Sequence, residues 1–534
     1  MVKSEKEALR CRQEGNKQYS KKQFDKALES YNESIRSCQF GDCHYFYAMG
    51  NKSALLFETK QFQKCKDIIN FIHTVDTFSE LFGSDKKFMA KIRNRLSSCD
   101  GQLTLSSDEG VESREPTAAE MEPEKYSSYP FINHSITTKN ISSFGCSVVA
   151  SKTLKPNEML FCVKPFTAVL GSPFWTSHCY NCFKYVKDSV IVPCNGCSEV
   201  SFCSVSCQEE HIIHKSYECS HIGFLKEVGL FHLGVSILLK FHIHGKLHEI
   251  INIYNRNRKD VPHKLSFSSS DIEFGIVNLC SSLTVTQSFL KNNLHILQAI
   301  FDKLFCDSSF DNLTSDIFVR TLSAISCQMM MNASTVVFYD KNSSCNKAIG
   351  SGIYPEIAKM NHSCHSNTVC LFDGTTATVK TTQNVIAGSQ LFNSYGYDFE
   401  SLDRNVRQSH LKAQYDFNCC CTACVLDWKR NEYLRVIVCQ TCSSTMYLSS
   451  TDEKCSKCSS EVTNKIKHDV KMLEETYSEA FQCYQRKEYQ KGIHILTCSE
   501  SVARIKILSM PDCLLLDWYD LVKKFIVLDF NERL

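Results

Sequence analysis

Closely spaced cysteines are the residues best suited to chemistry in this chain of 534 residues, which contains 31 of them. The segment 179–219 holds eight candidate metal ligands in four pairs: Cys179, Cys182, Cys194, Cys197, Cys203, Cys207, His214 and Cys219. Eight such ligands suffice for two tetrahedral zinc ions, and a segment with so little apolar content needs them to fold. His211 is a spare residue, by default a surface histidine and otherwise an alternative ligand to His214.

Two more cysteine clusters lie towards the C-terminus. Cys419, Cys421 and Cys424 in QYDFNCCCTAC offer three thiolates, so the fourth position of a zinc ion must be filled from a distance. Cys364 in MNHSCHSN, residues 360–367, is a candidate for that position. Two C-x2-C pairs form a typical four-thiolate ribbon: Cys439, Cys442, Cys455 and Cys458. Each site is closed by protein ligands, so we expect structural zinc and not hydrolytic zinc.

The MNHSCHSN stretch also allows two other interpretations, a glycosylation acceptor at Asn361-His362-Ser363 and the lining of a cofactor pocket. Glycosylation requires a secreted chain. The first residues, MVKSEKEALR, lack an apolar signal region, and the longest apolar stretch, 228–239, is too short to span a bilayer. We therefore expect a soluble intracellular protein with zinc-bound or packed cysteines. A net charge of +2 indicates neither nucleic-acid nor membrane binding.

Small and aromatic residues recur near the N-terminus at the spacing of paired antiparallel helices. Gly15, Ala27 and Ser34 are separated by aromatic residues, and a second copy starts at Gly50. This is typical of tetratricopeptide (TPR) repeats, with any pair of helical hairpins as the alternative. Residues 100–129 are acidic and rich in Ser, Thr and Pro, which predicts a flexible spacer or, alternatively, a partner-binding tail.

Strand-like composition begins near residue 130, with two short strands about the turn Lys155-Pro156-Asn157. Residues 220–330 are mainly helical in pattern, and strand-like composition returns after about Asn332. One β unit is therefore interrupted by inserted modules. The C-terminal region is helical again and places Ala480, Tyr489 and Gly492 at the TPR spacing.

This order of motifs closely resembles the SET and MYND domain (SMYD) family of protein-lysine methyltransferases. The resemblance rests on the zinc-finger insertion and on MNHSCHSN, NSYG and QYDFNCCCTAC, and covers roughly residues 130–425. The N-terminal repeats and the extra ribbon extend it over essentially the whole chain, to the TPR-bearing type-four branch. It implies a multidomain α+β fold, in which a SET β-fold is split by a MYND zinc finger and a helical insertion. A zinc-bound post-SET segment and flanking α-helical TPR-like regions complete this fold.

The expected domains follow from the motifs together with this resemblance. They are TPR-like helical repeats at 1–99, an acidic flexible linker at 100–129, the N-terminal SET part at 130–178, a MYND zinc finger at 179–219, a helical SET insertion at 220–331, the SET core at 332–413, a post-SET zinc segment at 414–427, a four-cysteine zinc ribbon at 428–462 and a C-terminal helical TPR-like region at 463–534.

The resemblance also implies cofactors and site residues. In the finger, Cys179, Cys182, Cys203 and Cys207 would bind one zinc ion, and Cys194, Cys197, His214 and Cys219 a second. Cys364 would complete the post-SET zinc, and the ribbon would bind a fourth ion. S-adenosylmethionine would contact Phe144, Gly145, Cys146, Asn332, Asn361, His362, Tyr395 and Phe417. Tyr395 and Tyr415 would border the lysine channel as catalytic residues, with packed core tyrosines as the alternative.

Some positions depart from the family pattern. Ser147 replaces a usual glycine, His365 and Ser366 alter the turn after Cys364, and Ile212 lies nearest to the place of a finger tryptophan. We expect a protein-lysine N-methyltransferase that acts on a histone or non-histone protein. The alternative is a weak or inactive adaptor that recruits partners in transcriptional regulation. We expect a monomer that binds protein partners through its TPR and MYND regions and binds neither membrane nor nucleic acid directly. The expected location is the cytoplasm and the nucleus.

Overall fold

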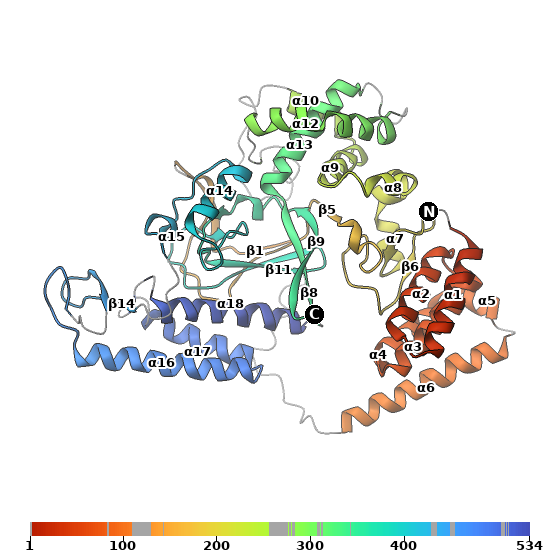
Figure 1. Cartoon of the computed structure of the whole chain (residues 1–534), viewed down its shortest axis with the longest axis horizontal. Coiled ribbons are helices and arrows are strands. Elements are labelled where there is room, and N and C mark those ends of the chain that lie inside the picture. Colours follow the sequence, from red (N-terminus) through yellow and green to blue (C-terminus); the bar gives the residue numbers. More distant parts are fainter. Residues whose placement is uncertain are drawn as a thin grey trace.

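The structure is a computed structural model, shown in Figure 1. It describes residues 3–82, 85–108, 130–142, 144–255, 276, 279, 283–306, 310, 313–341, 343–428, 435–448, 454–502, 508, 510 and 512–533. Within these residues, no helix is long and apolar enough to cross a membrane.

The N-terminal region is a stack of helices. Its elements are α1 (Glu5–Ser20), α2 (Phe24–Ser37), α3 (Cys43–Glu58), α4 (Phe62–Thr74), α5 (Asp76–Phe82) and α6 (Lys86–Asp108). Gly15 lets α1 and α2 approach closely, because an added Cβ would lie 2.6 Å from the Tyr31 ring. Ser34 Oγ in turn donates to the Ala8 carbonyl at 2.7 Å. Helix α6 continues past the predicted domain boundary at 99, and the rest of the predicted linker, 109–129, lies outside the described residues.

These helices pack against the cysteine-rich insertion, beside which they lie in Figure 1. Tyr45 Oη donates to the Ile191 carbonyl at 3.0 Å, and Asn32 Nδ2 donates to the Lys187 carbonyl at 2.7 Å. The Lys187 ammonium also lies 2.9 Å from Glu29 Oε1. The N-terminal helices and the insertion are therefore joined by hydrogen bonds as well as by apolar packing.

Strands from both sides of the insertion pair with one another. Those before it are β1 (Phe131–Ile132), β2 (Ile136–Ile141), β3 (Gly145–Ala150), β4 (Met159–Val163) and β5 (Thr167–Leu170). Those after it are β8 (Ser334–Asp340), β9 (Cys345–Ile353), β10 (Asn361–His362), β11 (Thr368–Asp373), β12 (Thr376–Thr381) and β13 (Phe392–Asn393). The sheets have the orders β1-β4-β12-β11, β5-β9-β8, β2-β3 and β10-β13. The pairs β4–β12 and β5–β9 thus join distant parts of the chain into one β unit.

The insertion contains the short strands β6 (Val192–Pro193) and β7 (Ser201–Phe202) and helix α7 (Val205–Glu210). The following helices are α8 (Ile222–Leu225), α9 (Phe231–Ile243), α10 (Leu247–Asn255), α12 (Leu283–Leu304) and α13 (Ser315–Asn332). Helix α13 ends where β8 begins, so the helical insertion returns the chain directly to the β unit.

The C-terminal part consists of α14 (Arg404–Tyr415), α15 (Thr422–Val425), the hairpin β14 (Arg435–Val438) and β15 (Thr445–Leu448), and α16 (Asn464–Gln485), α17 (Tyr489–Val502) and α18 (Cys513–Arg533). Helix α18 runs beside the central strands in Figure 1 and contacts β11. Gly492 permits the close packing of α17 on α18, because an added Cβ would overlap the Phe525 ring. The C-terminal helices therefore close one side of the β unit.

Candidate active site and zinc centres

The insertion brings its eight candidate ligands together in two sets. The first set is Cys179, Cys182, Cys203 and Cys207, and the second is Cys194, Cys197, His214 and Cys219, with ligand atoms within 4.8 Å of one another. A tetrahedral ion with Zn–S bonds of about 2.3 Å holds its sulfurs about 3.8 Å apart. The Cys203–Cys207 and Cys182–Cys203 sulfur separations are 3.5 and 3.6 Å. Both sets therefore fit zinc.

His214, and not His211, lies in the second set. His214 Nε2 is 3.2 Å from Cys194 Sγ, whereas His211 Nδ1 accepts a hydrogen bond from the His214 backbone at 3.1 Å. The expectation that His211 is a surface residue is wrong, because its ring is partly buried 5.1 Å from the Tyr180 ring. Burial lowers the pKa of His211 to about 4, so this ring is neutral at pH 7.

Glu218 supports this centre and was not singled out by the sequence. Its side chain is 1% exposed and accepts hydrogen bonds from Tyr180 Oη at 3.1 Å and from His232 Nε2 at 2.9 Å. Oε2, the carboxylate oxygen that accepts from Tyr180, lies 3.8 Å from His214 Nδ1, which is beyond hydrogen-bond distance. Burial opposes ionisation, but the neighbouring histidines hold the pKa of Glu218 below its usual value. Glu218 therefore packs behind the ligand imidazole without a hydrogen bond to it, and is held instead by Tyr180 and His232.

The third set joins Cys364 to Cys419, Cys421 and Cys424. Cys364 Sγ lies 3.5 Å from Cys424 Sγ and 3.9 Å from Cys419 Sγ, near the tetrahedral separation. Arg407, which is 1% exposed, places Nη2 3.6 Å from Cys424 Sγ. This buried cation offsets part of the negative charge of four thiolates. Its role depends on a tertiary contact, so no sequence spacing could have indicated it.

The ribbon cysteines also converge. Cys439 Sγ lies 3.5 Å from Cys458 Sγ, and Cys442 Sγ lies 3.7 Å from Cys455 Sγ. The hairpin β14–β15 carries the first pair, while the second pair follows in the chain. All four sets offer four protein ligands each, which is the donor set of structural zinc.

Strand β10 lies at the centre of the remaining site residues, and its two side chains serve different neighbours. Asn361 Nδ2 donates to Ser147 Oγ at 2.8 Å and lies 3.3 Å from the Cys146 carbonyl. It is also 3.2 Å from Gln390 Oε1. The Asn361 side chain therefore holds the start of β3 against β10.

The same contacts account for Ser147. This residue is fully buried, and its hydroxyl meets Asn361, so it does not project from the loop. Gly145 has φ +70°, and a Cβ added there would meet no atom within 4 Å. The Phe144 ring, in turn, lies 6.0 Å from the Phe392 ring on β13, the strand that pairs with β10. The loop thus presents open space at Gly145, where a bound molecule can approach the backbone.

His362 faces the aromatic side of the site. Its Nδ1 accepts a hydrogen bond from the Tyr395 backbone at 3.1 Å, which leaves the proton on Nε2, 3.3 Å from Cys364 Sγ. Burial lowers the pKa of His362 to about 4, so the ring is neutral at pH 7. The two ring nitrogens of His362 therefore link Tyr395 to Cys364 of the third cysteine set.

Tyr395, Tyr415 and Phe417 form an aromatic cluster beside His362. The Tyr395 and Tyr415 rings are 4.7 Å apart, and Phe417 lies 6.4 Å from Tyr415. Tyr395 Oη donates to the Met360 carbonyl at 2.9 Å. Tyr415 Oη accepts from Gln414 Nε2 at 3.2 Å, and burial raises the pKa of Tyr415 to about 12. Gln414 precedes Tyr415 in the QYDFN motif, but the sequence did not assign it a role.

The two tyrosines line a cavity of about 470 Å³ together with Asn332, Ser394 and Lys523. Asn332, at the end of α13, donates Nδ2 to the Gln328 carbonyl at 2.7 Å. Phe144, Gly145, Cys146 and Asn361 are not among the residues that line this cavity. The structure therefore brings Asn332 and both tyrosines to one side of β10 and the glycine loop to another.

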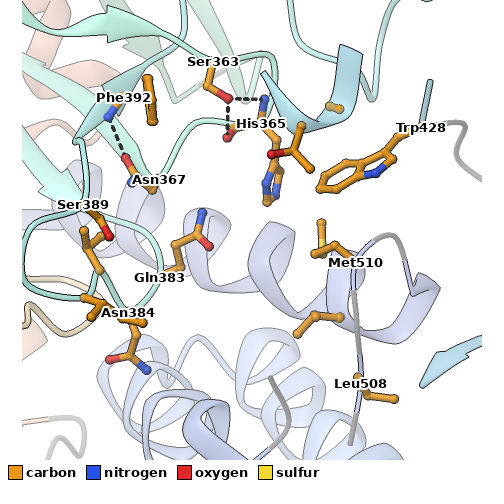
Figure 2. Close-up of a pocket in the computed structure, with 15 residues that line it drawn as sticks. Ser363, His365, Asn367, Gln383, Asn384, Ser389, Phe392, Trp428, Leu508 and Met510 are labelled. Carbon is orange, nitrogen blue, oxygen red and sulfur yellow. Dashed lines mark hydrogen bonds between the residues drawn. The ribbon is translucent and has the colours of Figure 1, made fainter. Parts of the chain in front are cut away.

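A second cavity, of about 430 Å³, lies between residues 422–428 and the C-terminal helices. Figure 2 shows its lining, with His365 beside Trp428. The His365 ring is 5.7 Å from the Trp428 ring and 5.8 Å from the Tyr519 ring on α18. Asn367 Oδ1 accepts from the Phe392 backbone at 2.7 Å. His365 is thus a packing residue that joins the turn after Cys364 to α18.

The chain is similar in sequence to several known proteins. Residues 179–219 match the MYND finger family. The chain is 21% identical to protein-lysine N-methyltransferase SMYD4 of Homo sapiens, over 82% of this chain and 69% of that protein. It is 26% identical to N-lysine methyltransferase SMYD2 of Gallus gallus, over 52% of this chain and 57% of that protein. The solved SET domain of LSMT bound to lysine and AdoHcy aligns at 11% identity with a TM-score of 0.28, over 75% of this chain and 87% of that one.

Proposed function

We propose that this chain, which belongs to the SET and MYND domain family, is a protein-lysine N-methyltransferase. It would transfer a methyl group from S-adenosylmethionine to a lysine side chain of a histone or non-histone protein. One observation carries the proposal: the rings of Tyr395 and Tyr415 lie 4.7 Å apart at a cavity. His362 lies beside them, and its neighbour Asn361 holds the segment that follows Gly145.

The residues present fit the proposed cofactor. Gly145 leaves open space at a loop backbone, Phe417 offers a partly buried aromatic face, and Asn332 lines the adjoining cavity. The full set would be Phe144, Gly145, Cys146, Asn332, Asn361, His362, Tyr395 and Phe417. The side chains of Asn361 and His362 already bond within the protein, so these two residues would offer mainly their backbone. S-adenosylmethionine, when bound, supplies a methyl group that is activated for attack by an amine.

The tyrosines can orient the attacking lysine. Tyr395 Oη donates a hydrogen bond to the Met360 carbonyl, and a hydroxyl oxygen that donates its hydrogen can also accept a hydrogen bond from the amine. Tyr415 Oη accepts from Gln414, so its own proton is directed elsewhere. With a pKa of about 12, Tyr415 stays protonated at neutral pH and does not act as a phenolate nucleophile.

The lysine must lose a proton before it reacts, since its reference pKa is about 10.4. The cavity is lined by both apolar and polar side chains, among them Asp398 and Lys523. Exclusion of water from it by a bound lysine would disfavour the ammonium form and so lower this pKa. The released proton would leave to water, because neutral tyrosines are poor bases. Holding the amine about 3–3.5 Å from the reacting carbon supplies much of the acceleration. The zinc sets are closed by four protein ligands each and act as structural supports.

The experiment is a transfer assay with tritiated methyl groups from S-adenosylmethionine and an array of lysine-containing peptides. We expect label on lysine, located by mass spectrometry, and at least a tenfold lower rate for Tyr395→Phe, since one oriented hydrogen bond is lost. Tyr185→Phe, a partly exposed tyrosine of the finger, is the matched control. If folded, zinc-loaded protein transfers no tritium to any peptide, the result would favour the alternative, an adaptor that only recruits partners.

A further inference from the structure

Helix α18 contributes a cation to the cavity that the two tyrosines line. Val369 of β11 lines this cavity and belongs to the same apolar cluster as Tyr519 and Val522 of α18. The helix therefore packs on the wall of the cavity, beside the central strands in Figure 1. Lys523 follows Val522, is half-buried and lines the cavity itself. The cavity thus receives side chains from the C-terminal helices as well as from the β unit.

Among the described residues that line this cavity, two are charged, and their charges are opposite. Asp398 lies three residues after Tyr395, and Lys523 lies on α18. Asp398 Oδ1 accepts a hydrogen bond from Ser394 Oγ at 2.7 Å, which holds this carboxylate beside the segment that carries Tyr395. The other lining side chains are apolar or carry neutral amide, hydroxyl or thiol groups. The cavity is therefore a neutral space with one carboxylate and one ammonium in its wall.

The Lys523 ammonium has no partner of its own among the described residues. Three carboxylates border the small cleft that it shares with the cavity, Asp398, Glu400 and Asp520, and none of them forms a salt bridge with it. Asp520 instead lies 2.8 Å from the Lys524 ammonium. A half-buried cation without a partner has lost part of its hydration, and an anionic ligand would offset that loss. Lys523 is therefore placed to meet an anion that enters the cavity.

We propose that Lys523 gives this enzyme a preference for target lysines that have an aspartate or glutamate within about three residues. The inference rests on the proposed methyltransferase function and names its class of substrate. The target lysine enters as an ammonium and is complementary to Asp398, whereas the neighbouring acid is complementary to Lys523. A sphere with the cavity volume of about 470 Å³ is about 10 Å across, which is the length of about three extended residues.

The same arrangement disfavours targets in basic segments. A second lysine or an arginine close to the target would bring a like charge towards the Lys523 ammonium, in a space where water screens it less than at an open surface. Specificity is the difference between the favoured and the disfavoured peptide, and one cation in the wall acts on both. Lys523 is therefore a specificity-determining residue and takes no part in the transfer step itself.

The test compares peptides that share one central lysine and differ at one position within three residues of it. Each peptide carries glutamate, glutamine or lysine there, and the full zinc-loaded chain transfers tritiated methyl groups from S-adenosylmethionine. At the best position, we expect kcat/KM for the glutamate peptide to exceed that for the glutamine peptide about three- to tenfold, because a half-buried ion pair is worth more than an exposed one. Added salt should reduce this ratio.

Variants at position 523 separate charge from packing. In Lys523→Gln the ratio of glutamate to glutamine peptide should fall to about one, and in Lys523→Glu the lysine peptide should become the best substrate. Lys523→Arg retains a cation and should retain the preference. Lys524→Gln is the matched control, because this exposed neighbour pairs with Asp520 and does not line the cavity. It should keep the ratio of the unchanged chain. Zinc content and circular dichroism confirm that each variant is folded.

Fluorescence anisotropy with the same peptides separates this inference from the proposed function, because binding requires no transfer. Label on no peptide would refute methyl transfer, whereas glutamate-selective binding that is lost in Lys523→Gln would still support the role of Lys523. Neither label nor binding with any peptide would overturn both. Methylation with equal rates for glutamate and glutamine peptides, a preference of the unchanged chain for the lysine peptide, or equal losses in Lys523→Gln and Lys524→Gln would each overturn the inference alone.

Discussion

Replacing Cys364 by Ser tests whether the turn after β10 and the cysteines of residues 419–424 share one zinc ion. Cys364 Sγ is 3.5 Å from Cys424 Sγ and 3.9 Å from Cys419 Sγ, so it occupies the fourth corner of a tetrahedron. A neutral serine hydroxyl is a much poorer zinc ligand than a thiolate. Structural zinc binding is worth about 10–16 kcal/mol, so losing one of four ligands costs about 3–4 kcal/mol, or two to three decades of zinc affinity.

The assay is elemental analysis of the purified chain after equilibration with a chelator of intermediate strength. We expect about four zinc ions in the unchanged chain, one for each cysteine set, and about three in Cys364→Ser. Cys420→Ser is the matched control, since this exposed neighbour lies in the same motif but outside the ligand set.

The zinc loss should also weaken the binding of S-adenosylmethionine. Cys364 belongs to the same apolar cluster as Tyr395, Tyr415 and Phe417, and His362 connects it to Tyr395. Without the zinc ion to fix residues 419–424, the chain around them would no longer hold these aromatic rings in place. Four zinc ions in Cys364→Ser, or equal losses in Cys364→Ser and Cys420→Ser, would refute this account of the turn.

Three further changes test other parts of the structure. Gln414→Leu removes the donor to Tyr415 Oη at 3.2 Å and should lower kcat about tenfold, with little change in KM for S-adenosylmethionine, in steady-state assays. Lys52 is 0% exposed, its Nζ has no hydrogen-bond partner among the described residues, and burial lowers its pKa well below 10.5. Because the unfolded chain binds this proton more tightly, the free energy of unfolding should rise between pH 7 and pH 10. Lys52→Met should remove that rise and stabilise the protein at pH 7 by about 1–4 kcal/mol, measured by urea denaturation; an unaltered pH profile would count against a buried, unpaired ammonium. Gly492→Ala should lower the free energy of unfolding by about 1–3 kcal/mol, measured by thermal denaturation, because its Cβ would overlap the Phe525 ring; an unchanged stability would mean that α17 and α18 are not packed this closely.

The zinc sets could be anticipated because ligand spacing is largely a local property. Cysteines two to four residues apart can share one ion almost regardless of their surroundings, and the structure places all four predicted sets together. Which of the two histidines binds the metal does not depend on local spacing alone. It depends on Tyr180, against which the His211 ring packs, and on Glu218, which lies behind His214.

The partners of the active-site residues could not be anticipated. Asn361 reaches back to Ser147, and Arg407 reaches forward to Cys424, through contacts that exist only after distant segments pack. The sequence identified Ser147 as a departure from the family pattern, whereas the structure gives its hydroxyl a buried partner. The length of α6 was also not anticipated. The amino-acid composition changes near residue 100, which placed the predicted domain boundary at 99, but the helix continues to Asp108.

Calorimetric titration of the zinc-loaded chain with S-adenosylmethionine tests the proposed enzyme most directly. We predict saturable binding of one molecule per chain. Asn361→Ala should weaken it, because Asn361 Nδ2 holds the start of β3, at Cys146 and Ser147, against β10. No binding heat at any temperature tested, from folded protein with its full zinc content, would contradict the account.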